Sequence, residues 1–146
     1  MFGHSRQAYY QNLKYDHQQS LDEEIILEMV RNGSSPDEVS RILNNRSGLV
    51  GLSGVSSNLQ EIIDEAEKGN ADCRLAYQVY AHRLKTYLGA YTWLLNGADA
   101  IVFTDDVGLR SWQLRQEVCS GVEALGITLD TVKNEAAQAD RATRVS

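Results

Sequence analysis

The sequence has few of the residues that mark secreted, membrane-spanning or nucleic-acid-binding proteins. One proline in 146 residues argues against long disordered linkers, and Cys73 and Cys119 stand alone, without a CxxC pair or a His-rich cluster. We therefore expect two small buried thiols in a reducing compartment and no zinc site. The N-terminal residues have no signal-peptide core, and no run of about 18 apolar residues could span a membrane. A net charge of −6 disfavours a nucleic-acid partner, and these absences together predict a cytoplasmic protein without a membrane partner.

What is present matches one folded domain. The hydrophobic content of 42% and the charged content of 23% are typical of globular proteins, and 146 residues can bury a sizeable core. Residues 1–19 lack any periodicity and predict an irregular leader. Residues 20–134 carry the periodic elements, and residues 135–146 are expected to form a polar tail.

Capping signals and apolar periodicity predict five helices. Ser35 and Pro36 begin the second of them, because a serine at the cap followed by proline at the first helical position is a typical start. Asn58 is expected to cap the third. Pairs of one asparagine and one glycine end several of the helices. In order, the helices are expected at about residues 20–32, from 35 onward, at 58–68, 71–95 and 111–125.

Two segments predict strands. Residues 46–57 alternate small and branched residues before a Gly/Ser turn, and residues 100–104 (AIVFT) form a short apolar run before the acidic turn Asp105–Gly108. The predicted fold class is therefore a helix-rich α/β domain. Two strands make a marginal sheet, so we expect this chain to be part of a larger architecture or an oligomer.

Three stretches in this order resemble the acetate and propionate kinase family. Residues 44–58 (NNRSGLVGLSGVSSN) are similar to a family pattern NKKSGLLGLSGVSSD, residues 80–104 to YAYRIRKYIGAYAAALNGLDAIVFT, and residues 118–130 (VCSGVEALGITLD) to a segment near the family's C-terminus. The resemblance implies a partial ribonuclease H-like C-terminal domain of the actin, Hsp70 and sugar kinase superfamily. It also implies phosphoryl transfer from ATP to acetate, giving ADP and acetyl phosphate with Mg²⁺, with this chain on the nucleotide side.

The family pattern implies a first nucleotide-binding segment directly after residues 53–57. There the family has Asp-x-Arg, and the matching positions are Asn58, Leu59 and Gln60. Neutral amides can hydrogen-bond a ribose or a base but offer no charge, so the resemblance predicts weakened nucleotide affinity.

A second implied segment follows the predicted strand at 100–104. The family's FTGGIGENS corresponds to FTDDVGLRS, so two aspartates replace the leading glycines. Two carboxylates beside a polyphosphate repel it unless a metal ion intervenes, and Arg110 could pair either with phosphate or with Asp106. We expect Asp105 and Asp106 to cap a helix rather than to bind metal. The implied nucleotide-binding residues here are Asp106, Val107, Gly108, Leu109 and Arg110.

No catalytic residue is assigned to this chain. His17 falls where the family has its transition-state arginine, and a neutral imidazole cannot supply a fixed cation at pH 7. The acetate pocket and a magnesium-associated glutamate are expected to lie outside these residues, so we expect no turnover by this chain alone.

Three interpretations remain open. The chain could be a nucleotide-binding part that works with a complementary domain. It could be a non-catalytic module that forms homodimers through the tyrosine-bearing helix at 71–95, or a gene fragment without an independent role. The tyrosines on that helix follow helical spacing and are expected to pack in a core or an interface rather than to stack on bases.

Overall fold

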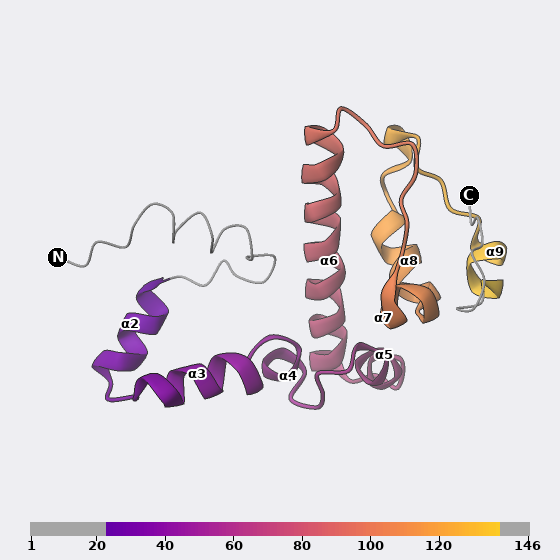
Figure 1. Cartoon of the computed structure of the whole chain (residues 1–146). Helices are drawn as coiled ribbons and strands as arrows, with labels where there is room; N and C mark the ends of the chain where they lie inside the picture. Colours follow the sequence, from indigo (N-terminus) through magenta and orange to yellow (C-terminus); the bar gives the residue numbers. More distant parts are fainter. Residues whose placement is uncertain (1–22, 138–146) are drawn as a thin grey trace. The chain divides into compact units, whose positions relative to one another are not determined.

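The computed structural model describes residues 23–137, and all regular structure within them is helical (Figure 1). These residues belong to two compact units, divided between Asn45 and Arg46. We describe each unit by itself.

The first unit contains α2 (Glu23–Arg31) and α3 (Pro36–Asn45), which pack against each other. Ser35 begins α3, since its Oγ accepts a hydrogen bond from the Glu38 backbone N–H at 3.2 Å. Val39 is the buried residue of α3. The predicted cap and helix start are therefore confirmed.

The second unit begins with α4 (Gly48–Ser53), α5 (Leu59–Glu67) and the 24-residue helix α6 (Ala71–Leu94). Both α4 and α5 pack against α6, as Figure 1 shows. The Asn58 side chain caps α5, and the Asn70 side chain caps α6 by accepting from the backbone N–H groups of residues 72 and 73. The expected limits of both helices are confirmed within one or two residues.

The second unit continues with three short helices and a 3₁₀ turn. These are α7 (Asp105–Arg110), α8 (Trp112–Cys119), the turn η1 (Glu123–Leu125) and α9 (Thr131–Ala136). Helix α8 contacts α6, α7 and α9, so it joins the short helices to the long one.

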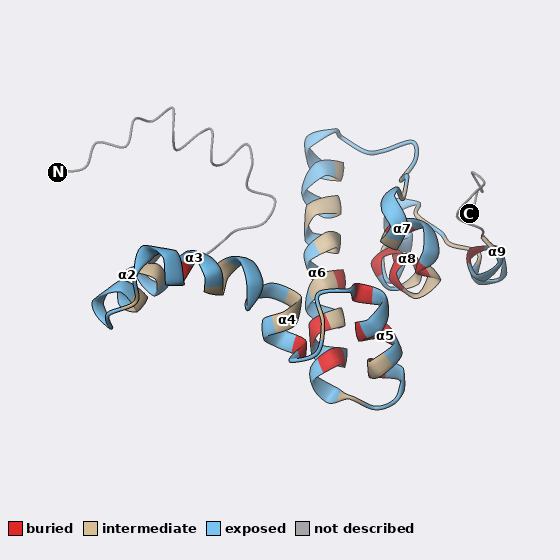
Figure 2. Cartoon of the chain, turned by 60° about the horizontal axis from the view of Figure 1, so that its bottom comes forward, coloured by how far each residue is buried: buried red, intermediate tan, exposed pale blue. Residues whose placement is uncertain are grey.

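The core of the second unit lies between α5, α6 and α8 (Figure 2). Both cysteine side chains are buried, and burial raises the pKa of each thiol above its ordinary value. The prediction of small buried thiols is therefore confirmed. The fully or nearly buried apolar residues are Leu59, Ile62, Ile63, Ala66, Cys73, Ala76, Ala81, Leu114, Val118 and Cys119.

The strand predicted within residues 46–57 is wrong, because six of these residues form α4. Leu49 packs on the core and Ser53 is buried four residues later, which is helical rather than alternating spacing. Glycine allows the tight geometry: a Cβ on Gly51 would lie 2.9 Å from the Arg46 carbonyl oxygen. Gly54 ends the helix with φ 66°, a left-handed conformation that glycine adopts without steric cost.

The strand predicted at residues 100–104 is also absent from residues 23–137. Ile101–Thr104 run without helix or strand assignment, and no described hydrogen bond involves the backbone of Ile101, Val102 or Phe103. A strand needs a neighbour whose backbone completes its hydrogen bonds, and the described residues supply none. The helix-rich part of the predicted fold class is therefore confirmed, whereas the two strands expected to make it α/β do not occur among residues 23–137.

The helix predicted at residues 111–125 is correct only in its first half. Helix α8 ends at Cys119, and Gly121 then adopts φ 66°, which a continuing right-handed helix does not allow. Helix α9 was not predicted. Its start carries a clear local signal, because the Asp130 side chain accepts a hydrogen bond from the Lys133 N–H at 3.0 Å.

Candidate functional site

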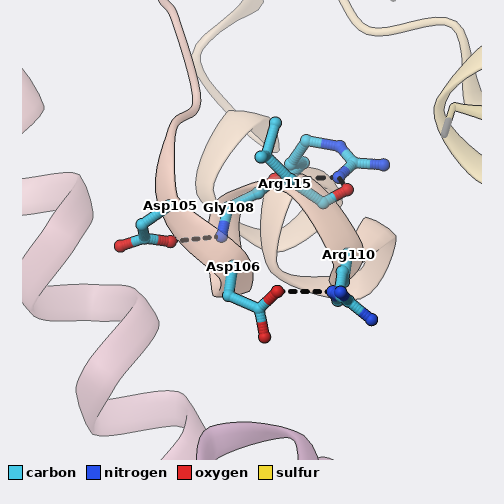
Figure 3. A network of polar contacts seen from close by, with 6 residues as sticks. Asp105, Asp106, Gly108, Arg110 and Arg115 are labelled. Carbon is cyan, nitrogen blue, oxygen red and sulfur yellow. Dashed lines mark hydrogen bonds and ion pairs between the residues drawn. The ribbon is translucent and has the colours of Figure 1, made fainter. Parts of the chain in front are cut away.

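The most constrained backbone in the implied nucleotide region is the start of α7. Asp105 has φ 63°, in the left-handed region that side chains other than glycine rarely adopt. Its Oδ1 accepts a hydrogen bond from the Gly108 N–H at 2.8 Å (Figure 3). Of the two aspartates expected to cap a helix, Asp105 does so, and its side chain compensates in part for the strained backbone beneath it, whereas Asp106 pairs with Arg110.

Gly108 is buried where α7 rests on the core. A Cβ at this position would lie 3.4 Å from the Phe103 Cβ and 3.6 Å from Asp105 Oδ1. These are ordinary van der Waals distances, so a methyl group would fit between the extended segment before α7 and the cap of α7. Neither space nor an unusual φ angle requires glycine at this position.

Asp106 and Arg110 form an ion pair on the exposed side of α7, with Arg110 Nε donating to Asp106 Oδ1 (Figure 3). Of the two partners expected for Arg110, the structure shows the aspartate. Pairs this exposed contribute little to stability because water screens them and ordering both side chains costs entropy. Both charged groups therefore remain available to a ligand at low energetic cost.

A buried arginine holds the other end of α7. Arg115 on α8 is only 4% exposed, and its NH1 donates to the carbonyl oxygens of Gly108 at 2.9 Å and Leu109 at 2.8 Å. These are carbonyls that the end of a helix leaves without intrahelical partners. Burial lowers the pKa of Arg115, although a guanidinium remains protonated across the physiological range.

Asn134 on α9 completes this arrangement and is fully buried. Arg115 Nε donates to Asn134 Oδ1 at 2.6 Å, and Arg115 NH2 donates to the Asn134 carbonyl at 2.8 Å. Asn134 Nδ2 in turn donates to the Trp112 carbonyl at 2.9 Å. Sequence reasoning missed both Arg115 and Asn134. A usable signal was the position of Arg115, since it lies between Leu114 and Val118 on the inward face of α8.

The first implied nucleotide segment lies at the start of α5. Asn58 Oδ1 accepts from the Gln60 N–H at 2.9 Å and the Glu61 N–H at 3.4 Å, while Gln60 Nε2 donates to Asp64 Oδ1 at 2.9 Å. The Leu59 side chain is buried in the core. Of the three residues, Asn58 and Gln60 therefore present side chains to solvent.

One apolar cluster supports both implied nucleotide segments. Leu59 belongs to it, and Val107 of α7 packs against it together with Tyr80 of α6. Burial raises the pKa of Tyr80, and the nearby Asp105 carboxylate adds to the shift. The start of α5 and the helix α7 are thus fixed to the same rigid support, as expected for two parts of one site.

The serine-rich stretch between α4 and α5 is structural. Ser53 is buried, and its Oγ accepts from the backbone N–H groups of Val55 at 3.2 Å and Ser56 at 3.3 Å. The same hydroxyl donates to the Ser56 carbonyl at 3.2 Å. Ser53 therefore shapes the loop that leads into Asn58.

Residues 23–137 contain neither a cluster of metal-ligating side chains nor a helix suited to cross a membrane. No group of three or more His, Cys, Asp or Glu side chains there could hold a metal ion. None of the helices in that range, including α6, has the length and apolar character required to cross a bilayer. His17, which matches the family's arginine position, lies outside the described residues.

Comparison with known proteins decides the family. The sequence profile of the acetokinase family matches residues 18–146. The chain belongs to the acetokinase family.

Relatives of this acetokinase-family chain are acetate kinases. The acetate kinase of Dictyoglomus thermophilum is 47% identical over 110 residues, which cover 75% of this chain and 28% of that protein. The crystal structure of Porphyromonas gingivalis acetate kinase superposes with a TM-score of 0.74 at 37% identity, over 82% of this chain and 30% of that one. Entamoeba histolytica acetate kinase gives 0.74 at 36% identity, over 81% of this chain and 31% of that one. The chain thus spans less than a third of the length of these relatives.

Proposed function

We propose that this chain is the nucleotide-side part of an acetate kinase-type phosphotransferase and binds ADP or ATP between the start of α5 and α7. The observation that carries the proposal is the backbone of α7. Asp105 stands where the family pattern has glycine, yet it keeps the left-handed φ of 63° that glycine favours. The side chain has changed while a glycine-type backbone path remains.

In this proposal the exposed amides of Asn58 and Gln60 contact the ribose or base, and α7 lies beside the phosphates. Asn58 uses its Oδ1 as a helix cap, so its Nδ2 is the group that donates to the nucleotide. Arg110 exchanges Asp106 for a phosphate, because a charge-assisted hydrogen bond to phosphate replaces an exposed ion pair.

The acidic side chains predict that the metal-bound nucleotide binds better than the free one. Asp105 and Asp106 add negative charge beside the phosphates, and a cation on the nucleotide reduces that repulsion. Mg²⁺ commonly reaches proteins with one or two carboxylates and the substrate's own phosphates. Asp106 is the carboxylate that fits this role, since Asp105 is committed to the Gly108 N–H.

The family reaction transfers phosphate between ATP and acetate, and catalysis depends on positioning and on positive charge at the transferred group. Helix α7 carries two aspartates and one arginine, so its net charge is −1 and it supplies no net positive charge. We propose that this chain binds nucleotide but does not turn over acetate without a complementary part of the acetate kinase fold.

The surface supports the proposal of a protein partner. Val102 is 77% exposed in the extended segment, and Trp93 is 87% exposed at the end of α6. We propose that Ile101–Thr104 join a ribonuclease H-like sheet contributed by the complementary part of the fold. The same surface favours the second candidate, a non-catalytic module that pairs with another copy of this chain.

Three measurements test these proposals. Calorimetric titration with MgADP and MgATP is expected to give saturable binding tighter than millimolar, and absence of binding refutes the nucleotide role. A hydroxamate assay with acetate and MgATP is expected to give no turnover from this chain alone. Turnover in that assay contradicts the need for a complementary part. Dimers in analytical ultracentrifugation, together with no nucleotide binding in calorimetry, favour the second candidate.

A further inference from the structure

The buried pair Arg115 and Asn134 links three short helices. Arg115 lies on α8, its NH1 bonds the last carbonyls of α7, and its Nε and NH2 bond Asn134 on α9. Asn134 Nδ2 returns to the Trp112 carbonyl at the start of α8. We call this set of hydrogen bonds the Arg115–Asn134 clamp.

Helix α7 depends on contacts of this kind. It has six residues, and isolated helices of that length are unstable because nucleation is costly. Its first residue, Asp105, is strained, and its remaining anchors to the core are Val107 and Gly108. The clamp is what fixes the direction in which α7 ends.

The geometry of Arg115 in turn depends on Asn134. No ion pair of Arg115 occurs among residues 23–137, so its charge is held by carbonyl and amide oxygens rather than by a carboxylate. A planar guanidinium can reach α7 and Asn134 together, which a lysine ammonium cannot do in the same way. Asn134 is the one buried residue of α9, and the other residues of Thr131–Ala136 are exposed.

We propose that Arg115 and Asn134 are positioning residues that hold α7 in its nucleotide-binding orientation, so that α9 controls nucleotide affinity without touching the ligand. This inference rests on the proposed nucleotide role. When α7 occupies the competent orientation for only a fraction of the time, the apparent Kd rises by the inverse of that fraction. If that fraction falls from near one to about one tenth, the apparent Kd rises about tenfold.

The test uses the full chain and three variants. Asn134→Leu removes the side-chain amide oxygen and nitrogen at similar volume. Arg115→Lys keeps the positive charge but loses the planar guanidinium with its several N–H donors. This second variant tests the same bonds if Asn134→Leu does not fold. Val132→Ala is the matched control, because it alters an exposed side chain on the same helix. Amide exchange is measured at Gly108 and Ser111 for α7 and its end, and at Ile62 for α5, followed by calorimetric titration with MgADP.

The expected result is local. Asn134→Leu and Arg115→Lys should remove most of the protection at Gly108 and Ser111, leave exchange at Ile62 within about twofold, and raise the Kd for MgADP about tenfold. Val132→Ala should change neither quantity. Equal loss of protection at Ile62, or an unchanged Kd although α7 has lost its protection, overturns the positioning role alone. A wild-type chain that does not bind MgADP refutes the proposed nucleotide role and the positioning role with it.

Discussion

The left-handed backbone at Asp105 predicts an unusual order of stability among substitutions. Asp105→Ala removes the Oδ1 that accepts from the Gly108 N–H, a loss of about 1 kcal/mol for a capping interaction. Alanine must also keep φ near 63°, where it is less tolerated than aspartate. The free energy of unfolding should therefore fall by about 1–2 kcal/mol.

Asp105→Gly loses the same hydrogen bond but relieves the left-handed strain. Glycine should therefore be more stable than alanine at this position by about 1 kcal/mol, even though it increases the entropy of the unfolded chain. In a chain of this size that difference corresponds to a melting temperature about 2–4 °C higher. Asp105→Asn should stay close to wild type, because asparagine keeps an acceptor and tolerates this φ.

Calorimetric or circular-dichroism melts of the three variants measure the order. Gln78 provides the control, since it is exposed in the middle of α6, where alanine should be more stable than glycine by about 1 kcal/mol. The two positions should thus show opposite orders. If alanine equals or exceeds glycine at position 105, the backbone there is not left-handed and the argument for a retained glycine-type path fails.

Three further predictions concern the same unit. Burial, with Glu117 nearby, raises the pKa of Tyr77 to about 12. The contribution of Tyr77 to stability is therefore fully present below the unfolded pKa near 10 and is lost as the pH rises to 12. Tyr77→Phe should flatten the fall in melting temperature over that pH range. Asn58→Ala should lower the free energy of unfolding by about 1 kcal/mol in urea, whereas Asn58→Asp should not, because it keeps the cap of α5. Asp106→Asn should strengthen binding of metal-free ADP several-fold in calorimetry, and more at low ionic strength, since it removes a charge beside the phosphates; equal affinities at all salt concentrations contradict that placement.

Helices α3, α5 and α6 were predictable because their signals are local. Ser35, Asn58 and Asn70 each cap a helix through their own side chains, and such bonds involve residues only two or three positions apart. The segment 46–57 misled because glycines among aliphatic residues look like alternation, whereas burial follows the helical spacing of Leu49 and Ser53.

The extended segment shows a different limit. Residues 101–104 have strand-type composition, but a strand is defined by a neighbour, and sequence alone does not say whether that neighbour lies in the same described region. Val102 is exposed there, and no strand among residues 23–137 lies beside it. The apolar pattern thus identifies a segment suited to a strand but does not identify the neighbouring strand.

The candidate site was predictable in part. Residues 105–108 were expected to form a turn, whereas the structure has helix α7 from Asp105; the capping role of Asp105 follows from aspartate chemistry. Arg115 and Asn134 were not recognised, because their bond joins residues 19 positions apart and depends on how α8 and α9 pack. Polar residues on an otherwise inward helix face are the pattern that would have indicated them.

The central claim is that one nucleotide contacts both the start of α5 and helix α7. Nuclear magnetic resonance titration with MgADP tests it most directly through the backbone amides of Gln60 and Gly108. Both amide signals should shift along one saturation curve, with a midpoint below millimolar concentrations of MgADP. If neither amide responds, or if the two respond with different midpoints, the proposed nucleotide site is contradicted.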